Sequence, residues 1–183
     1  MARRPLFHRI ADQKKAQSPL ESLAQGLAAA AAPVYGVAVL GSRLLHDLGV
    51  RDRQELSSIV LSVGNITLGG TGKTPFTKWL ARWLKSEGRA VAVLSRGYGR
   101  EDEDRLVVVH DGRKLRASTR EGGDEPVQIA RALGDVPVIS CADRHRAGKM
   151  AERRFSVDTL VLDDGFQHHA LAREGDIVLV DST

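Results

Sequence analysis

The chain has 183 residues, of which 42% are hydrophobic and 27% are charged, and its formal net charge is +4. This length can bury the core of one α/β domain, and the ordinary hydrophobic content excludes a globally disordered chain. The single cysteine, Cys141, excludes an internal disulfide and fits a reducing compartment; the apolar run before it predicts a buried thiol at a strand end.

Positive charge is concentrated near the N-terminus. Residues 1–53 contain eight Lys/Arg against four Asp/Glu, whereas residues 54–183 contain nineteen of each. This distribution argues against a nucleic-acid groove in the globular part, so no nucleic acid partner is expected. It favours an anionic membrane surface as the partner of the N-terminal segment.

Residues 1–53 are expected to form a helical, membrane-associating segment before a nucleotide-binding domain at 54–183. Several basic residues precede an apolar stretch, Leu23 to Leu45, which Pro33 interrupts. Two interfacial helices broken at the proline fit this pattern, because the stretch is too weakly apolar to favour a spanning helix. The alternative is that these helices pack on the domain, and the sequence leaves both possibilities open.

The next feature is a glycine-rich turn between a predicted strand at 59–63 and a predicted helix at 76–85. This layout is typical of a phosphate-binding loop, in which backbone N–H groups and the helix N-terminus surround phosphate oxygens. Lys73 can reach the β- and γ-phosphates, and Thr74 can place its hydroxyl on Mg²⁺. Thr67 stands where the usual pattern has its first glycine. The predicted phosphate-binding residues are Gly69, Gly70, Thr71, Gly72, Lys73 and Thr74.

The rest of the chain alternates strands and helices. Strands are predicted at 90–94, 136–140, 159–162 and 177–180, helices at 122–133 and 144–155, and a hairpin at 106–117. This order predicts a parallel sheet with helices on both faces, as in P-loop NTPases. The segments that leave the strands at Gly64, Ser95, Ser140 and Asp163 are expected to converge on one crevice at the carboxyl edge of the sheet.

The strand at 159–162 ends in the pair Asp163-Asp164. An apolar strand that ends in aspartate downstream of a phosphate loop is typical of a Walker B element, whose carboxylate holds Mg²⁺. The alternative is a pair of exposed turn aspartates. His168 and His169 follow, but no second cluster with zinc-ligand spacing accompanies them, so magnesium is favoured over zinc.

Taken together, these segments resemble the tetraacyldisaccharide 4′-kinase family, the lipid A kinases. The resemblance rests on VGNITLGGTGKTP at 63–75 and on the pattern from LDDGFQHH to DIVLVD at 162–181. SRGYG at 95–99 and GDEP at 123–126 match in the same order. The family's loop has the same GG-T-GKT form, which accounts for Thr67. The resemblance covers residues 33–183, and family members are usually about twice this length.

The resemblance implies an ATP- and Mg²⁺-dependent kinase that phosphorylates the 4′-hydroxyl of an acylated glucosamine disaccharide 1-phosphate in lipid A biosynthesis. It implies a location at the cytoplasmic face of the bacterial inner membrane, where the basic N-terminal segment would dock the enzyme beside its lipid substrate.

The matching motifs also imply roles for particular residues. Asp124 would be the catalytic base, assisted by Lys73 and Asp164; the alternative for Asp124 is a helix N-cap. The metal would be held by Thr74, Asp163 and Asp164. The residues implied on the substrate side are Asn65, Arg96, Gln167 and His168.

Two other functions are compatible with a phosphate loop. A partition-type regulatory ATPase would use its nucleotide as a switch, but Leu68 stands where that class has its signature lysine. A truncated nucleotide-binding remnant without sugar-kinase activity is the other alternative.

Overall fold

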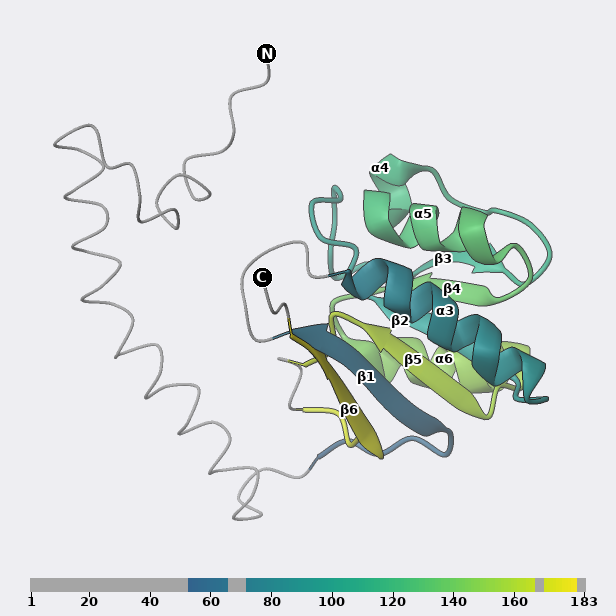
Figure 1. Ribbon diagram of the computed structural model, residues 1–183. Coiled ribbons are helices and arrows are strands. Elements are labelled where there is room, and N and C mark those ends of the chain that lie inside the picture. Colours follow the sequence, from purple (N-terminus) through teal and green to yellow (C-terminus); the bar gives the residue numbers. More distant parts are fainter. Residues whose placement is uncertain (1–52, 66–71, 167–169, 181–183) are drawn as a thin grey trace, which may run out of the picture. The chain divides into compact units, whose positions relative to one another are not determined.

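The computed structural model describes residues 53–65, 72–166 and 170–180 (Figure 1). Within these residues the chain forms a six-stranded sheet in the order β3-β4-β2-β5-β1-β6. The strands are β1 Ile59–Asn65, β2 Val91–Ser95, β3 Val107–Asp111, β4 Pro137–Ser140, β5 Thr159–Asp163 and β6 Gly175–Leu179. The helices are α3 Lys73–Ser86, α4 Thr119–Gly122, α5 Asp124–Leu133 and α6 Arg144–Phe155.

The sheet is mixed, which corrects the expectation of a fully parallel one. Strand β1 pairs in parallel with β5 and β6, and β2 pairs in parallel with β4 and β5, but β3 is antiparallel to β4. No helix is present between β2 and β3. For β3 to run parallel to β2, a crossover would have to carry the chain back to the end of the sheet at which β2 begins. Without that crossover, β3 begins near the end of the sheet at which β2 finishes, so β3 runs antiparallel to the other strands.

The hairpin predicted at 106–117 forms only in part. Its first arm is β3, but the second arm contributes a single bridge between His110 and Leu115. The Asp111 carboxylate accepts hydrogen bonds from the backbone N–H groups of Arg113 and Lys114, which closes a tight turn. Strand β3 pairs along its length with β4 instead, so the prediction of a second strand at residues 114–117 was wrong.

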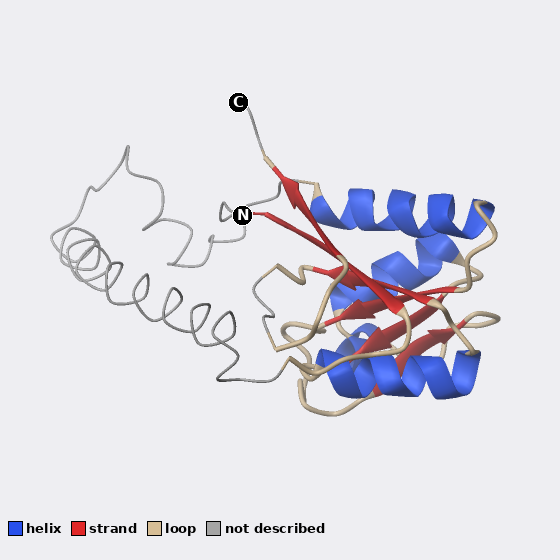
Figure 2. Cartoon of the chain, turned by 90° about the horizontal axis from the view of Figure 1, so that it is seen from below, coloured by secondary structure: helices blue, strands red, loops and turns tan. Residues whose placement is uncertain are grey.

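Helices cover both faces of the sheet, as predicted (Figure 2). Helices α3 and α5 pack on one face against alternate residues such as Val91 and Val93. Helix α6 packs on the other face against the intervening residues, among them Ala92 and Leu94. All five residues of β2 are buried, as expected for a central strand that is apolar on both sides.

The predicted N-terminal helices at 1–52 lie outside the described residues, so the expectation for them stays a prediction. In the part of the chain that is described, no helix is both long enough and apolar enough to cross a bilayer.

Candidate active site

The carboxyl edge of the sheet brings the first residues of α3 next to the end of β1. Gly72 precedes the helix in the left-handed conformation, with a φ of 79°, and Lys73 is its first residue. Among the described residues no side chain caps this helix, and its first turn contains no acidic residue. The free N–H groups and the positive end of the helix dipole are therefore available to an anion.

Lys73 connects three segments of the site. Its ammonium group donates a hydrogen bond of 2.9 Å to Asn65 Oδ1 at the end of β1. It also lies 3.0 Å from Asp164 Oδ1, immediately after β5. The Lys73 side chain is 23% exposed and that of Asp164 is 61% exposed, so the pair is still reached by solvent. The predicted lysine, aspartate and asparagine therefore lie together.

Asp163 is the buried member of the aspartate pair, with only 2% of its surface exposed. Its Oδ1 accepts a hydrogen bond of 2.8 Å from the hydroxyl of Thr77 in α3. Burial raises the pKa of Asp163 to about 6, and the nearby carboxylates of Glu125 and Asp164 act in the same direction. The Thr77 hydrogen bond and the Lys73 charge oppose this rise. Such a carboxylate is stabilised by an added cation.

A close backbone contact fixes the loop after β5 against β1. A Cβ atom added at Gly64 would lie 2.4 Å from Phe166 Cβ, which is far inside van der Waals contact. The N–H of Gly165 also donates to the carbonyl of Val63 at 3.1 Å. Only glycine at position 64 allows this approach, which holds the Asp163-Asp164 turn beside Lys73.

Asp124 is the first residue of α5 and is exposed. The N-cap of this helix is Gly123, and the described structure contains no side-chain cap there, so the alternative of Asp124 as the N-cap was wrong. Gly123 has a φ of 94°, and a Cβ on it would lie 3.0 Å from Gly97 Cα in the loop after β2. The motifs SRGYG and GDEP thus pack directly on each other.

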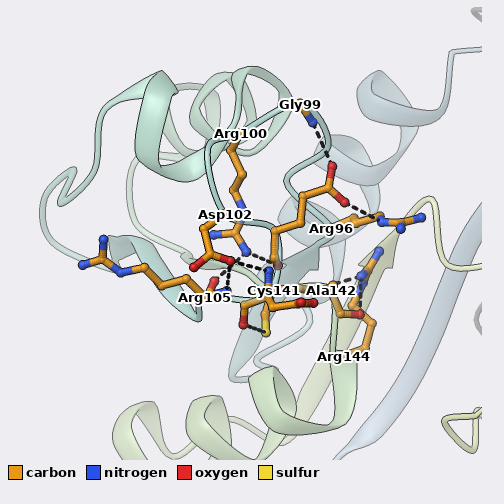
Figure 3. Close-up of polar contacts among 10 residues, drawn as sticks. Arg96, Gly99, Arg100, Asp102, Arg105, Cys141, Ala142 and Arg144 are labelled. Atoms are coloured by element: carbon orange, nitrogen blue, oxygen red, sulfur yellow. Dashed lines mark hydrogen bonds and ion pairs between the residues drawn. The ribbon is translucent and has the colours of Figure 1, made fainter.

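The loop after β2 is held rigidly by hydrogen bonds (Figure 3). The buried guanidinium of Arg100 donates to the carbonyls of Glu103 and Arg105 and to that of Glu121 at the end of α4. The N–H of Ala142, beyond β4, donates to the carbonyl of Glu103 at 2.9 Å. Arg100 therefore joins this loop to the segment that leads into α5.

Arg96, which is predicted on the substrate side, pairs with Glu103 at 3.1 Å (Figure 3). Glu103 also accepts a hydrogen bond from the N–H of Gly99. The Arg96 side chain is still 60% exposed, so it is accessible to an anionic ligand that replaces Glu103 as its partner.

Two charged residues near the aspartate pair were not predicted from the sequence as site residues. Glu125 follows Asp124 in the same motif, and its carboxylate helps to raise the pKa of Asp163. Arg144 begins α6, is 3% exposed and donates to the carbonyls of Cys141 and Ala142. Burial, followed by repulsion from Arg96, lowers its pKa to about 10, so Arg144 stays charged at neutral pH.

Of the remaining predicted site residues, only Thr74 lies within the described ranges. Thr74 is the second residue of α3 and is half-buried. The loop residues Gly69, Gly70 and Thr71, with Gln167 and His168, lie outside the described ranges. Within residues 53–65, 72–166 and 170–180, no group of three or more His, Cys, Asp or Glu side chains is placed to hold a metal ion.

The sequence pattern of the family described as tetraacyldisaccharide-1-P 4′-kinase matches residues 24–183. The chain belongs to this family. The family resemblance predicted from the phosphate loop and the aspartate pair is therefore confirmed.

Curated members of the tetraacyldisaccharide 4′-kinase family are similar over most of this chain. The protein of that name from Halothermothrix orenii is 45% identical over 81% of this chain and 38% of its own length. The one from Geobacter metallireducens is 41% identical over 88% of this chain and 48% of its own length. This chain thus spans less than half the length of these relatives.

A solved structure from the same family has a similar fold. It is the "apo" form of LpxK from Aquifex aeolicus in complex with ATP. The match has a TM-score of 0.76 and 36% sequence identity, and it covers 83% of this chain and 48% of the other.

Proposed function

We propose that this chain forms the ATP-binding part of a tetraacyldisaccharide 4′-kinase, which transfers the γ-phosphate of ATP to the 4′-hydroxyl of tetraacyldisaccharide 1-phosphate in lipid A biosynthesis. The observation that carries the proposal is the position of Lys73, between Asn65 and Asp164 at the uncapped start of α3. A cation at a helix N-terminus beside an aspartate pair suits a nucleotide triphosphate with its metal. The related LpxK structure, solved in complex with ATP, supports this nucleotide.

Mg²⁺ is the second cofactor in the proposal. The Thr74 hydroxyl and the carboxylates of Asp163 and Asp164 are hard oxygen donors, the class that Mg²⁺ prefers. The buried Asp163 fits this role, because burial raises its pKa and a bound cation would offset the cost of keeping this carboxylate charged. When bound, the ion would neutralise charge on the phosphate oxygens.

Asp124 is proposed as the general base. Its carboxylate would accept the proton of the 4′-hydroxyl as that oxygen forms a bond to the γ-phosphorus. The bond from the γ-phosphorus to the bridging oxygen would break, and ADP would leave. Lys73 and the first N–H groups of α3 would oppose the charge on the phosphates. The exposed position of Asp124 at the edge of the sheet leaves it accessible to an acceptor.

The proposed location is the cytoplasmic face of the bacterial inner membrane. The acceptor is a lipid, and residues 1–53 carry the whole net positive charge of the chain. Docking of this segment on an anionic bilayer would keep the enzyme beside its substrate.

The test is product analysis with γ-labelled ATP, Mg²⁺ and tetraacyldisaccharide 1-phosphate in mixed micelles. We expect labelled lipid and ADP in equal amounts. Formation of ADP without labelled lipid, with or without the acceptor, would support a regulatory ATPase instead. Binding of ATP without either product would restrict the role of this chain to nucleotide binding.

A further inference from the structure

The outward surface of α6 contains an open groove of about 590 Å³. Leu106 and Met150 supply its apolar lining, and the basic lining residues are Arg146, Lys149, Arg153 and Arg154. Arg146, Arg153 and Arg154 are exposed, so their guanidinium groups are accessible from solvent. This groove belongs to the face of the sheet that α6 covers, not to the strand-end residues of the candidate active site.

The positive charge of the groove is only weakly compensated. Asp143 also lines it, but its carboxylate caps α6 by accepting the N–H of Arg146. Glu152 lies 3.9 Å from Lys149, and its Oε1 accepts the N–H of Ser58 at 2.8 Å. Among the described residues, no carboxylate pairs with Arg153 or Arg154.

This concentration of charge is local. Residues 54–183 contain equal numbers of basic and acidic residues, so a random distribution would leave no strongly positive face. The four basic lining residues, Arg146, Lys149, Arg153 and Arg154, lie at intervals of three, four and one along α6, which spreads them along its outward side. An extended row of cations suits a surface with many phosphates better than it suits one small anion.

The chain segment that follows the basic N-terminal residues runs along the same helix. A Cβ atom on Gly148 of α6 would lie 2.3 Å from Leu56 Cδ1, so Leu56 packs on the helix backbone. The hydrogen bond from Ser58 to Glu152 continues this contact. Residues 56 and 58, which follow the positively charged segment in the sequence, therefore contact the helix whose outward residues line the groove.

We propose that the groove along α6 is a contact surface for the anionic phospholipid headgroups of a bilayer. Arginine binds phosphate oxygens through two parallel N–H groups, and each basic residue near an anionic bilayer strengthens binding. The apolar stems of these side chains and Met150 suit the boundary between headgroups and acyl chains. The proposal rests on the membrane location of the proposed kinase and assigns to it a second surface, in the folded domain. Vesicle binding needs no phosphoryl transfer, so the two proposals can fail separately.

The test compares three proteins, each containing all 183 residues, on vesicles of phosphatidylcholine with and without 30% phosphatidylglycerol, at low and high salt. The groove variant carries Arg146→Gln, Arg153→Gln and Arg154→Gln. The matched control carries Arg113→Gln, Lys114→Gln and Arg131→Gln, which removes the same charge from exposed positions outside the groove. Circular dichroism and thermal unfolding establish that all three proteins are folded.

We expect the groove variant to bind anionic vesicles at least about tenfold more weakly than the parent chain at low salt. The control should stay within about threefold, and the difference should disappear at high salt, where exposed charges are screened. An equal loss in both variants would reduce the effect to net charge and overturn the proposal. Unchanged vesicle binding by the groove variant would overturn it as well.

Discussion

Lys73 at the start of α3 and Asp164 after β5 form an ion pair of 3.0 Å. The pair exists because β1 and β5 are neighbours in the sheet, which brings the loops after both strands to one place. The same lysine also donates to Asn65. Phosphate would have to compete with these two partners for the ammonium group, so the lysine is held in position before the nucleotide arrives.

Replacement of Lys73 by alanine should weaken ATP binding about 10- to 100-fold, since a hydrogen bond to a charged group contributes about 1.5–3 kcal/mol. Isothermal titration with ATP and Mg²⁺ measures the change. The fold should persist, because Lys73 lies at the accessible N-terminus of α3. Lys78→Ala, in the same helix, is the control. ATP affinity equal to that of the parent chain would contradict the phosphate-loop assignment.

Replacement of Asp164 by alanine should raise the Mg²⁺ concentration needed for half-maximal ATP binding, because one donor of the proposed metal site is lost. The effect can be separated from the loss of the Lys73 ion pair by repeating the titration without metal. If the metal-free affinity falls by the same factor as the affinity with Mg²⁺, Asp164 acts through Lys73 alone.

Asp163 should make stability depend on pH. Its pKa is raised from 3.8 to about 6, so between these values the folded state binds more protons than the unfolded state, and stability falls as pH rises through this window. The full effect, about 3 kcal/mol at most, is reached above pH 6. Asp163→Asn should therefore be more stable than the parent chain at pH 7.5 without metal, and similar to it near pH 4.

Urea unfolding at the two pH values measures this difference, with Asp135→Asn as an exposed control. A variant that is destabilised equally at both pH values would show that the Thr77 hydrogen bond outweighs the cost of burying the charge.

Gly64→Ala should destabilise the domain by about 1–3 kcal/mol, because the new methyl group would overlap Phe166 Cβ at 2.4 Å. The cost should be smaller when Phe166 is changed to glycine, which removes that Cβ, than when Phe166 is changed to alanine, which keeps it. A double-mutant cycle by chemical unfolding measures the coupling. Equal costs of Gly64→Ala in both backgrounds would mean that the contact is not the cause.

Asp124→Asn should lower phosphoryl transfer about 10²- to 10⁴-fold while ATP binding is retained, because an amide cannot take the hydroxyl proton. Stability should change little, since Asp124 does not cap α5. Rates with the lipid acceptor, measured alongside ATP titration, distinguish the two effects. A near-normal transfer rate would assign the proton to another group.

The sequence predicted the strands and helices around the site well, because each is marked by strong local signals. The bounds of α6 agree at both ends with the prediction, since Asp143 caps the helix and basic residues fill its last turn. The antiparallel direction of β3 was not predicted, because it depends on the absence of a crossover helix between β2 and β3 and not on the strand's own residues.

Within the site, Lys73, Asp163 and Asp164 could be predicted because loop and strand motifs identify them. Glu125 and Arg144 could not, since their role depends on which helix N-termini meet at the carboxyl edge of the sheet. The basic groove on α6 was missed for another reason. The net charge of residues 54–183 is zero, so the total charge gives no sign that basic residues are concentrated on one face of α6.

The strand order has a consequence for how the protein is made. Strand β1 is the first of the six described strands to be synthesised, yet its two neighbours, β5 and β6, are the last two of the six. Until residues near 160 emerge, β1 has no partner, and its apolar residues stay exposed on the nascent chain. During the same period β2, β3 and β4 cannot be joined to β1, because β5 lies between β2 and β1 in the sheet. This sheet therefore cannot be completed until β5 and β6 have been synthesised, and a growing chain halted before β5 should be held by chaperones rather than folded.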